Sequence, residues 1–397
     1  MDMPPAYFIR QCICTMLTLV AIVAGINIIV DPYLLFDLPR TAEFNARKPA
    51  ISEQEHLIKA YEVLRFNPRT LLLGSSSVAM GLDARSTAWR TSERPVYNLG
   101  LPGEGVFANR RYLQHVLAKE HPNTVFLGLS FRDFLTVRPQ HEHPFESRLA
   151  MSSGGSPNPL IRRQLVKDVL YATLSLDSLF ESFDTLRGNL SGDSYDTISG
   201  NVDPHWHRME ISRFGTYPLI VLTDLNYTQM YRDSRVDEDV WEQVRLIFEL
   251  CRGHGISLIV ILEPAHVDEL ELADIAGKWG AVEEWKRQLS KMVAKYEARQ
   301  GHFELWDFFG YNSYSTESVP YTKSPLRWFL TPSHYTQALG DLMLERIMGS
   351  GDPSFGVKLI PSNIEGHLAD IRHARSVYRE TQRRDAERVR ILYAQIS

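Results

Sequence analysis

The sequence has few cysteines, no excess of basic residues and no internal repeat. Its 397 residues include only 3 cysteines, too few for a disulfide framework. Lys and Arg total 43 against 48 Asp and Glu, giving a net charge of −5. A nucleic-acid-binding protein would normally be basic, so that class is disfavoured. With 44% apolar and 23% charged residues, collagen-like, coiled-coil and disordered chains are excluded, and a sizeable globular core is expected.

One long uncharged segment lies near the amino terminus. Residues 12–30, CICTMLTLVAIVAGINIIV, would form a helix about 28 Å long, close to the hydrocarbon thickness of a bilayer. A cleaved signal peptide ending near Gly25 is the alternative, but strongly apolar residues continue beyond that point. We therefore expect residues 1–30 to form a cytoplasmic stub and a transmembrane anchor that contacts lipid through residues 12–30.

The direction of insertion follows from the short basic head. Arg10 precedes the apolar segment, and a long domain follows it. This arrangement favours export of the domain. In a bacterium, the expectation is a single-pass inner-membrane protein whose catalytic domain lies in the periplasm.

After a linker and first helix at residues 31–60, short apolar segments alternate with helical stretches up to residue 350. This pattern predicts a parallel sheet covered by helices on both faces, an α/β domain with three layers over residues 61–350. The expected strands are residues 69–73, 96–99, 124–129, 256–262 and 303–306.

Two regions depart from this alternation. Residues 136–236 are rich in Ser, Gly, Pro and Asn, with a helical pair between Leu160 and Leu186, and are expected to form a helical insertion beside the strand ends. Residues 351–397 are densely charged, with apolar residues at helical spacing. They are expected to form a helical tail packed on the domain; docking of a partner is the alternative.

Chemically useful residues follow the expected strands. Ligands of an open α/β sheet gather beyond the carboxyl ends of its strands. A serine in a strand-to-helix turn, as in Gly74-Ser75-Ser76, has an exposed hydroxyl and an outward N–H, which suits a nucleophile. The segment is not a P-loop, because Leu82 follows its second glycine, nor an α/β-hydrolase elbow, because Val78 replaces a glycine. His334, before a late helix, is the candidate base.

The order of these motifs resembles the SGNH hydrolase superfamily. Gly-x-Ser follows the first strand, Asn98-x-Gly-x-x-Gly follows the second, and His334-Tyr335 precedes a terminal helix. The anchor followed by Asp31-Pro32-Tyr33 is similar to membrane-tethered members, which include periplasmic alginate O-acetyltransferase subunits and the teichoic acid D-alanine transfer protein. The resemblance covers roughly residues 65–135 and 240–350, and implies a flavodoxin-like fold.

The resemblance also implies roles for individual residues. Ser76 would be the nucleophile and His334 the general base, and the amides of Ser76 and Gly103 would line an oxyanion hole. Two positions depart from the family pattern. Ser130 stands where an Asn is usual, so Ser130, or alternatively Arg132, would be the third oxyanion donor.

The second departure concerns the acid that orients the histidine. Three residues before His334 the family usually has an acid, and here the residue is Thr331. Asp307, at the end of the preceding strand, is the first candidate replacement. Thr331 itself or a carbonyl, giving a dyad, is the second, and a site that has lost catalysis and only binds is the third.

Further candidates are polar or aromatic residues near the strand ends. Glu263 and His266 would line the expected pocket, with His266 as an alternative base, or would form a structural pair. Two His-x-His pairs, 141/143 and 205/207, have spacing compatible with zinc but no carboxylate or Cys companion, so no metal and no cofactor are expected. The candidate substrate-binding residues are Asn98, Arg132, Glu263, His266 and Trp328.

These features predict a membrane-anchored periplasmic serine O-acyltransferase or esterase acting on a cell-envelope or secreted polysaccharide. Its partners would be an acylated donor, a polysaccharide acceptor and a membrane acyltransferase, with no nucleic acid. The first alternative is a catalytically silent subunit that binds glycan or partner in an acetylation or export complex. The second is a structural membrane protein that assembles through its carboxyl helix.

Overall fold

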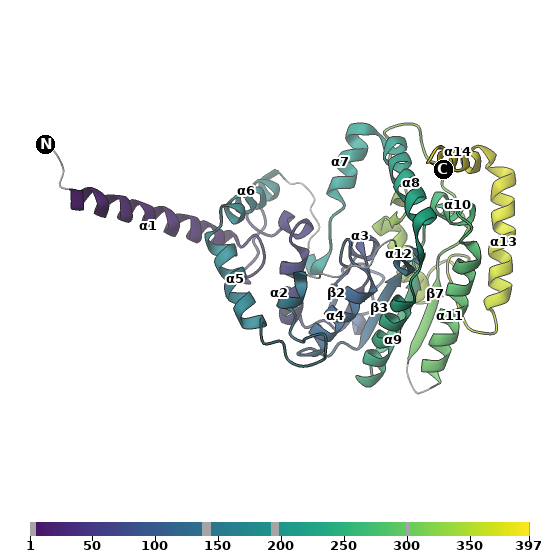
Figure 1. Ribbon diagram of the computed structural model, residues 1–397, viewed down its shortest axis with the longest axis horizontal. Helices are drawn as coiled ribbons and strands as arrows, with labels where there is room; N and C mark the ends of the chain where they lie inside the picture. The colour runs from purple at the N-terminus through teal and green to yellow at the C-terminus, as the bar shows by residue number, and fades with distance from the viewer. Residues whose placement is uncertain (1–4, 137–143, 192–197, 299–301, 397) are drawn as a thin grey trace. The chain divides into compact units, whose positions relative to one another are not determined.

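The computed structural model describes residues 5–136, 144–191, 198–298 and 302–396 (Figure 1). The chain divides into two compact units that are interleaved in sequence. The first unit comprises Met1–Arg65 and Pro144–Ile198, and the second comprises Phe66–His143 and Ser199–Ser397.

The first unit is helical. Its main helices are α1 (Pro5–Val30), α2 (Glu55–Phe66), α5 (Ile161–Leu174) and α6 (Leu176–Ser191), with short 3-10 turns η1 (Pro49–Ser52) and η4 (Pro144–Arg148). The buried ammonium of Lys48 donates to the carbonyls of Val30, at 2.7 Å, and Asp31, at 2.8 Å. A cation at these last carbonyls stabilises the end of α1.

Helix α1 is apolar along its length. Within the described residues, Ala6–Val30 is the one helix long and apolar enough to cross a membrane. Most of this helix is exposed, unlike the core helix of a soluble protein, and its last turns pack against α5 and α6. By length and composition, the chain thus has one candidate membrane span, which includes the predicted segment 12–30.

The second unit is built on a six-stranded sheet with the order β10-β7-β6-β3-β1-β2. All strand pairs are parallel except β10 with β7. The strands are β1 (Thr70–Leu73), β2 (Val96–Asn98), β3 (Thr124–Leu129), β6 (Ser257–Leu262), β7 (Phe303–Asp307) and β10 (Val357–Lys358). The predicted α/β class with a mostly parallel sheet is confirmed, and each predicted strand lies within one residue of an observed one.

Both faces of the central strands are covered by helices. Alternate side chains, including Leu72, Phe126 and Ile261, share one core with α3 (Ser76–Gly81) and α12 (Gln337–Ile347). Strand side chains alternate between faces, and the intervening Leu71, Val125 and other residues are equally buried. The other helices beside the sheet are α4 (Val106–Leu117), α9 (Glu238–Gly253), α10 (Val267–Ile275) and α11 (Trp279–Glu297).

The expected single insertion at 136–236 is shared between the two units. Its first helices, α5 and α6, belong to the first unit, whereas α7 (His205–Phe214) and α8 (Thr216–Asp233) belong to the second. The smaller elements of the second unit are η2 (Thr91–Glu93), η3 (Phe131–Phe134), β4 (Leu135–Thr136), β5 (Arg235–Val236), β8 (Phe329–Thr331) and β9 (His334–Tyr335); η5 (Ile198–Gly200) lies at the boundary.

The charged tail forms two helices, α13 (Ile364–Thr381) and α14 (Arg383–Ile396). Helix α13 packs on α11, and α14 packs on α8 and α10. The guanidinium of Arg388 on α14 is buried between the carboxylates of Asp224 and Asp268. Several basic side chains of the tail are therefore neutralised by carboxylates of the second unit.

Candidate active site

Ser76 and His334 meet at the carboxyl end of β1. Ser76 is the first residue of α3, which follows β1, and His334 lies in β9, just before α12. The chain runs from β1 to β2 on one side and then to β3 on the other, so this turn lies where the strand order reverses, the usual ligand position. Ser76 Oγ is 2.7 Å from His334 Nε2, and both residues are partly exposed.

Close packing of α3 against α12 brings these two residues together. A Cβ on Gly340 would lie 1.9 Å from the carbonyl oxygen of Gly81, and a Cβ on Gly81 would lie 2.2 Å from the ring of Tyr335. Ser77 Oγ donates to the carbonyl of Ser333 at 2.8 Å. The absence of side chains at Gly81 and Gly340 lets the segments approach closely, and the hydrogen bond of Ser77 holds them together. These features fix the separation of the Ser76 and His334 segments.

The second ring nitrogen of His334 faces hydroxyls. Nδ1 lies 2.6 Å from Thr331 Oγ1 and 3.3 Å from Ser333 Oγ. If Ser76 donates to Nε2, the neutral ring carries its proton on Nδ1 and donates it to Thr331. Thr331, three residues before His334, therefore orients the imidazole.

A chain of polar groups continues from this point to a buried carboxylate. Ser333 Oγ is hydrogen-bonded to the hydroxyl of Tyr227, which accepts from Arg132 Nη1 at 3.1 Å. Arg132 Nε donates to Glu269 Oε1 at 2.9 Å. The nearest carboxylate along this chain thus acts on His334 only through Arg132, Tyr227 and Ser333.

Asp307 is not the residue that orients His334, which corrects the first candidate for the missing acid. Its Oδ2 lies 2.6 Å from Lys286 Nζ and 2.7 Å from His367 Nε2, and its Oδ1 accepts from the N–H of Phe309. Burial would raise the pKa of Asp307, but Lys286 and His367 hold it below its ordinary value. Asp307 is a structural ion-pair residue at the end of β7.

The environment of His334 keeps its imidazole neutral. Burial lowers its pKa well below the ordinary value, and the neighbouring His207 and Arg132 act in the same direction. A histidine must be unprotonated to accept a proton from a serine. The lowered pKa therefore keeps the base available at neutral pH, although it also makes the ring a weaker base.

The predicted oxyanion donors differ in availability. The amide of Ser76 lies in the first turn of α3, where helical N–H groups have no intrahelical acceptor. Gly103 is exposed with a φ of 78°, and open space surrounds the position of its missing Cβ. The amide of Ser130 donates to Asp133 Oδ2 at 2.7 Å and is therefore occupied.

Asn98 is committed to holding α3 rather than a ligand. Its side-chain amide donates to the carbonyls of Val78, at 2.9 Å, and Leu82, at 2.8 Å. Its Oδ1 accepts from the N–H of Gly100 at 2.9 Å, and the residue is fully buried. Asn98 thus ties the end of β2 to the helix that carries Ser76.

Glu263 and His266 each contact a residue of the β8–β9 segment. Burial raises the pKa of Glu263 to about 8, with Asp133 adding to the effect, and Tyr335 donates to it at 3.3 Å. His266 Nε2 bonds to the carbonyl of Glu317 at 2.6 Å, and its main-chain N–H donates to Pro332. These contacts give both residues structural partners, but none of them joins Glu263 to His266, and Glu263 Oε2 is buried without a hydrogen-bond partner among the described residues.

Trp328 packs within the second unit. Its ring contacts Tyr314, with centroids 5.0 Å apart, and lies under the guanidinium of Arg327 at 4.4 Å. These contacts give Trp328 a packing role and no placement beside Ser76.

His207 and Tyr227 are site residues that the sequence patterns did not assign to this site. The ring of His207 lies 5.3 Å from that of His334, and burial lowers its pKa to about 4. The spacing of His205 and His207 had suggested zinc; within the described ranges no group of three or more His, Cys, Asp or Glu side chains could hold a metal ion. The other pair, 141/143, lies outside the described residues.

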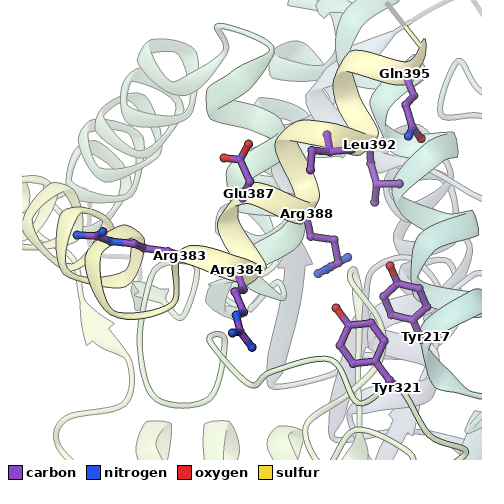
Figure 2. Close-up of a pocket in the computed structure, with 9 residues that line it drawn as sticks. Tyr217, Tyr321, Arg383, Arg384, Glu387, Arg388, Leu392 and Gln395 are labelled. Atoms are coloured by element: carbon purple, nitrogen blue, oxygen red, sulfur yellow. The ribbon is translucent and has the colours of Figure 1, made fainter.

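A separate groove of about 650 Å³ lies along α14 (Figure 2). Neither Ser76 nor His334 is among the residues that line it. Tyr217 and Tyr321 form one wall, with stacked rings whose centroids are 4.5 Å apart. Arg383 and Arg384 of α14 line it as well, together with Glu387, whereas the guanidinium of Arg388 is paired with Asp224 and Asp268. An aromatic surface beside cations is suited to a sugar ring with an acidic substituent.

No protein-family model matches the chain, and no curated protein matches it.

Proposed function

We propose that the chain is a membrane-anchored periplasmic serine O-acyltransferase or esterase of the SGNH type. The observation that carries the proposal is the 2.7 Å separation of Ser76 Oγ and His334 Nε2, two residues 258 positions apart. A serine and a histidine in hydrogen-bond contact, both reachable from outside, form the minimal unit of nucleophilic acyl transfer.

The sheet supports the finer fold assignment. Counted among the parallel strands alone, the spatial order is 2-1-3-4-5, the order of flavodoxin-like doubly wound sheets. Ser76 follows the first of these strands and His334 directly precedes α12, the helix that comes after the last parallel strand, β7, which agrees with the order of the SGNH motifs.

The proposed reaction has two steps. Ser76 Oγ attacks the carbonyl carbon of an ester donor while its proton passes to His334 Nε2, and Nδ1–H remains bonded to Thr331. The tetrahedral oxyanion is held by N–H groups at the start of α3 and by Gly103. When the intermediate collapses, the leaving alcohol takes the proton from Nε2 and the acyl group stays on Ser76.

The acceptor reverses these movements. A hydroxyl gives its proton to His334 Nε2 and its oxygen attacks the acyl carbonyl carbon. The bond from that carbon to Ser76 Oγ then breaks, and Nε2 returns the proton to Oγ, which restores the free serine. Water as acceptor makes the protein an esterase, and a sugar hydroxyl makes it a transferase. The aromatic and basic groove along α14 supports a polysaccharide as the acceptor, and the anchor would keep the protein beside a membrane acyl donor.

Labelling with a fluorophosphonate tests the proposal. The reagent phosphonylates an activated serine, so wild-type protein should be labelled on the peptide containing Ser76. Ser76→Ala should abolish the label and His334→Ala should slow it by at least about 100-fold. Ser75→Ala is the matched control, because the side chain of Ser75 makes no cap hydrogen bond, and it should label as wild type does.

A silent glycan-binding subunit is the second candidate, and two observations favour it. His334 has a hydroxyl rather than a carboxylate at Nδ1, and the groove beside Tyr217 and Tyr321 does not include Ser76 in its lining. This candidate predicts no fluorophosphonate label together with binding of an acidic oligosaccharide that Tyr321→Ala weakens. Labelling of Ser76 would exclude it.

A further inference from the structure

Helix α6 has its polar side inward and its apolar side outward. The side chains buried within the first unit are Ser178, Ser182, Thr185 and Asn189, each at most 5% exposed. The outward face carries Leu176, Phe180, Phe183 and Leu190, which are 53–74% exposed. Residues three and four apart share a helix face, so each set forms one continuous stripe. A helix of a water-soluble protein has the opposite arrangement.

Helix α5 shows the same feature. Val166, Leu170 and Leu174 are exposed along one side, whereas Asp168 is buried. The carboxylate of Asp168 is bonded to Arg148 at 2.8 Å. Both helices therefore turn apolar surface away from the unit and satisfy polar groups inside it.

These helices pack around the last turns of α1, the candidate membrane span (Figure 1). The buried Asn27 of α1 donates to the carbonyl of Thr173 at 3.0 Å and accepts from Ser182 Oγ at 3.0 Å. In the same turns of α1, Ile28 and Ile29 are exposed. The exposed apolar surface of α1 thus continues onto α5 and α6.

We propose that α5 and α6 lie in the interfacial layer of the bilayer, with their apolar faces against the acyl chains. The proposal is independent of the chemistry at Ser76. Helix α6 has 16 residues, about 24 Å, and Asp177 and Asp184 are exposed on its flank, so it lies along the membrane surface rather than across it.

Basic side chains indicate the lipid class. Arg162, Arg163 and Lys167 on α5 are exposed among its apolar residues. Long basic side chains beside an apolar helix face extend to the headgroup layer and pair with phosphate groups. The surface is therefore suited to a leaflet that contains anionic lipid.

Lipid accounts for this surface better than a protein partner. The apolar face is continuous with α1, which is itself expected to be surrounded by acyl chains, so the same medium covers both. Contiguous exposed apolar surface of this extent is otherwise unfavourable in water.

Spin-label accessibility in the full chain tests the proposal. The protein would carry Cys12→Ser and Cys14→Ser, leaving the buried Cys251, and be reconstituted into phosphatidylethanolamine–phosphatidylglycerol vesicles. Single nitroxide labels would be placed at Phe180→Cys and Phe183→Cys. Leu222→Cys, on α8 of the second unit and 57% exposed, is the matched control at an exposed apolar position.

Collisions with oxygen, which concentrates in lipid, are compared with collisions with a water-soluble nickel chelate. We expect the oxygen-to-nickel collision ratio at Phe180 and Phe183 to exceed the Leu222 ratio by about 10-fold. Equal ratios at the three positions would overturn the proposal in favour of water. Low collision rates with both reagents at Phe180 and Phe183 would also overturn it, because a protein partner or second copy would then cover the face.

Discussion

At the scale of the residue, the unusual feature of the site is the hydroxyl at the second nitrogen of His334. A carboxylate would fix the tautomer and stabilise the imidazolium that forms when Ser76 loses its proton. Thr331, 2.6 Å from Nδ1, can fix the tautomer but brings no charge. The site is thus arranged for proton transfer with less stabilisation of the charged ring than a triad provides.

Substitutions of Thr331 test this interpretation. Thr331→Val leaves the partly buried Nδ1–H with only the longer contact to Ser333 Oγ, at 3.3 Å, and should slow fluorophosphonate labelling of Ser76 by about 10- to 100-fold. Thr331→Ser should retain most of the rate, and Thr331→Asp should raise both the rate and the pKa of His334. Labelling of Thr331→Val at the wild-type rate would show that Thr331 does not orient the ring.

The buried carboxyl of Glu263 makes stability depend on pH. Its folded pKa of about 8 lies above the ordinary value of 4.5, so folding retains a proton that the unfolded chain releases. Stability therefore falls as pH rises from 4.5 to 8, by up to about 5 kcal/mol. Glu263→Gln lacks this loss, and its melting temperature in detergent should exceed that of wild type at pH 8.5 but not at pH 4.5.

The exposed Glu242 on α9 supplies the control. Glu242→Gln should leave the change in melting temperature between pH 4.5 and 8.5 as in wild type, because Arg245 lowers the pKa of this exposed carboxyl and keeps it ionised over that range. A Glu263→Gln protein with the same pH dependence as wild type would contradict the assignment of a raised pKa to this group.

The positions of single site residues were predictable where those residues belong to a short sequence motif. Ser76 and His334 lie in short segments whose order along the chain predicted that the two side chains meet, and they do. The role of Thr331 was open among three alternatives, because the distance from His334 to Asp307 depends on tertiary packing. The link from Tyr227 to Ser333 has no local signal, since α8 and the β8–β9 turn are about a hundred positions apart.

At the scale of the element, contact between α3 and α12 determines the geometry of the site. Gly340→Ala would place a methyl group 1.9 Å from the carbonyl oxygen of Gly81 and so force the helices apart. We expect a loss of about 1–3 kcal/mol in the free energy of unfolding and slower labelling of Ser76. Thermal unfolding and labelling kinetics would measure both effects.

Gly280 on α11 is the matched control, because nothing lies within 4 Å of the position its Cβ would take. Gly280→Ala should stabilise the helix by about 0.5–1 kcal/mol and leave labelling unchanged. If the two alanine variants behave alike, close packing at Gly340 does not control the site.

Elements with a strong apolar pattern were predictable, and those with an inverted pattern were not. The five parallel strands are rich in apolar residues because both of their faces are covered, although Glu304 interrupts β7. Residues 136–236 were interpreted as one insertion because their Ser, Asn and Gly content is typical of loops. In α6 the serines face inward, so its pattern identifies a helix but not the side that packs.

At the scale of the whole molecule, the two units are interleaved in sequence. The chain leaves the first unit after residue 65, forms three strands of the sheet, returns at residue 144 and leaves again after residue 198. Sequence patterns give the elements in order but not which of them share a core. The candidate membrane span was predictable because the length and composition that define it are read directly from the sequence.

The proposed orientation predicts a periplasmic carboxyl terminus. In a bacterial host, alkaline phosphatase fused after Ser397 should be active, because that enzyme folds only outside the cytoplasm, whereas a fluorescent protein that requires the cytoplasm should stay dark. The chain should also resist extraction from membranes at pH 11. A dark phosphatase fusion with a bright fluorescent one would place the second unit in the cytoplasm.

The central claim is that Ser76 carries an acyl group during the reaction. The most direct measurement is mass spectrometry of peptides after rapid acid quenching of the purified full chain with an activated aryl acetate. We predict an added acetyl group on the peptide containing Ser76 and none in Ser76→Ala. Absence of acetyl on Ser76 in folded wild-type protein, with acetyl on another residue or on none, would contradict the account.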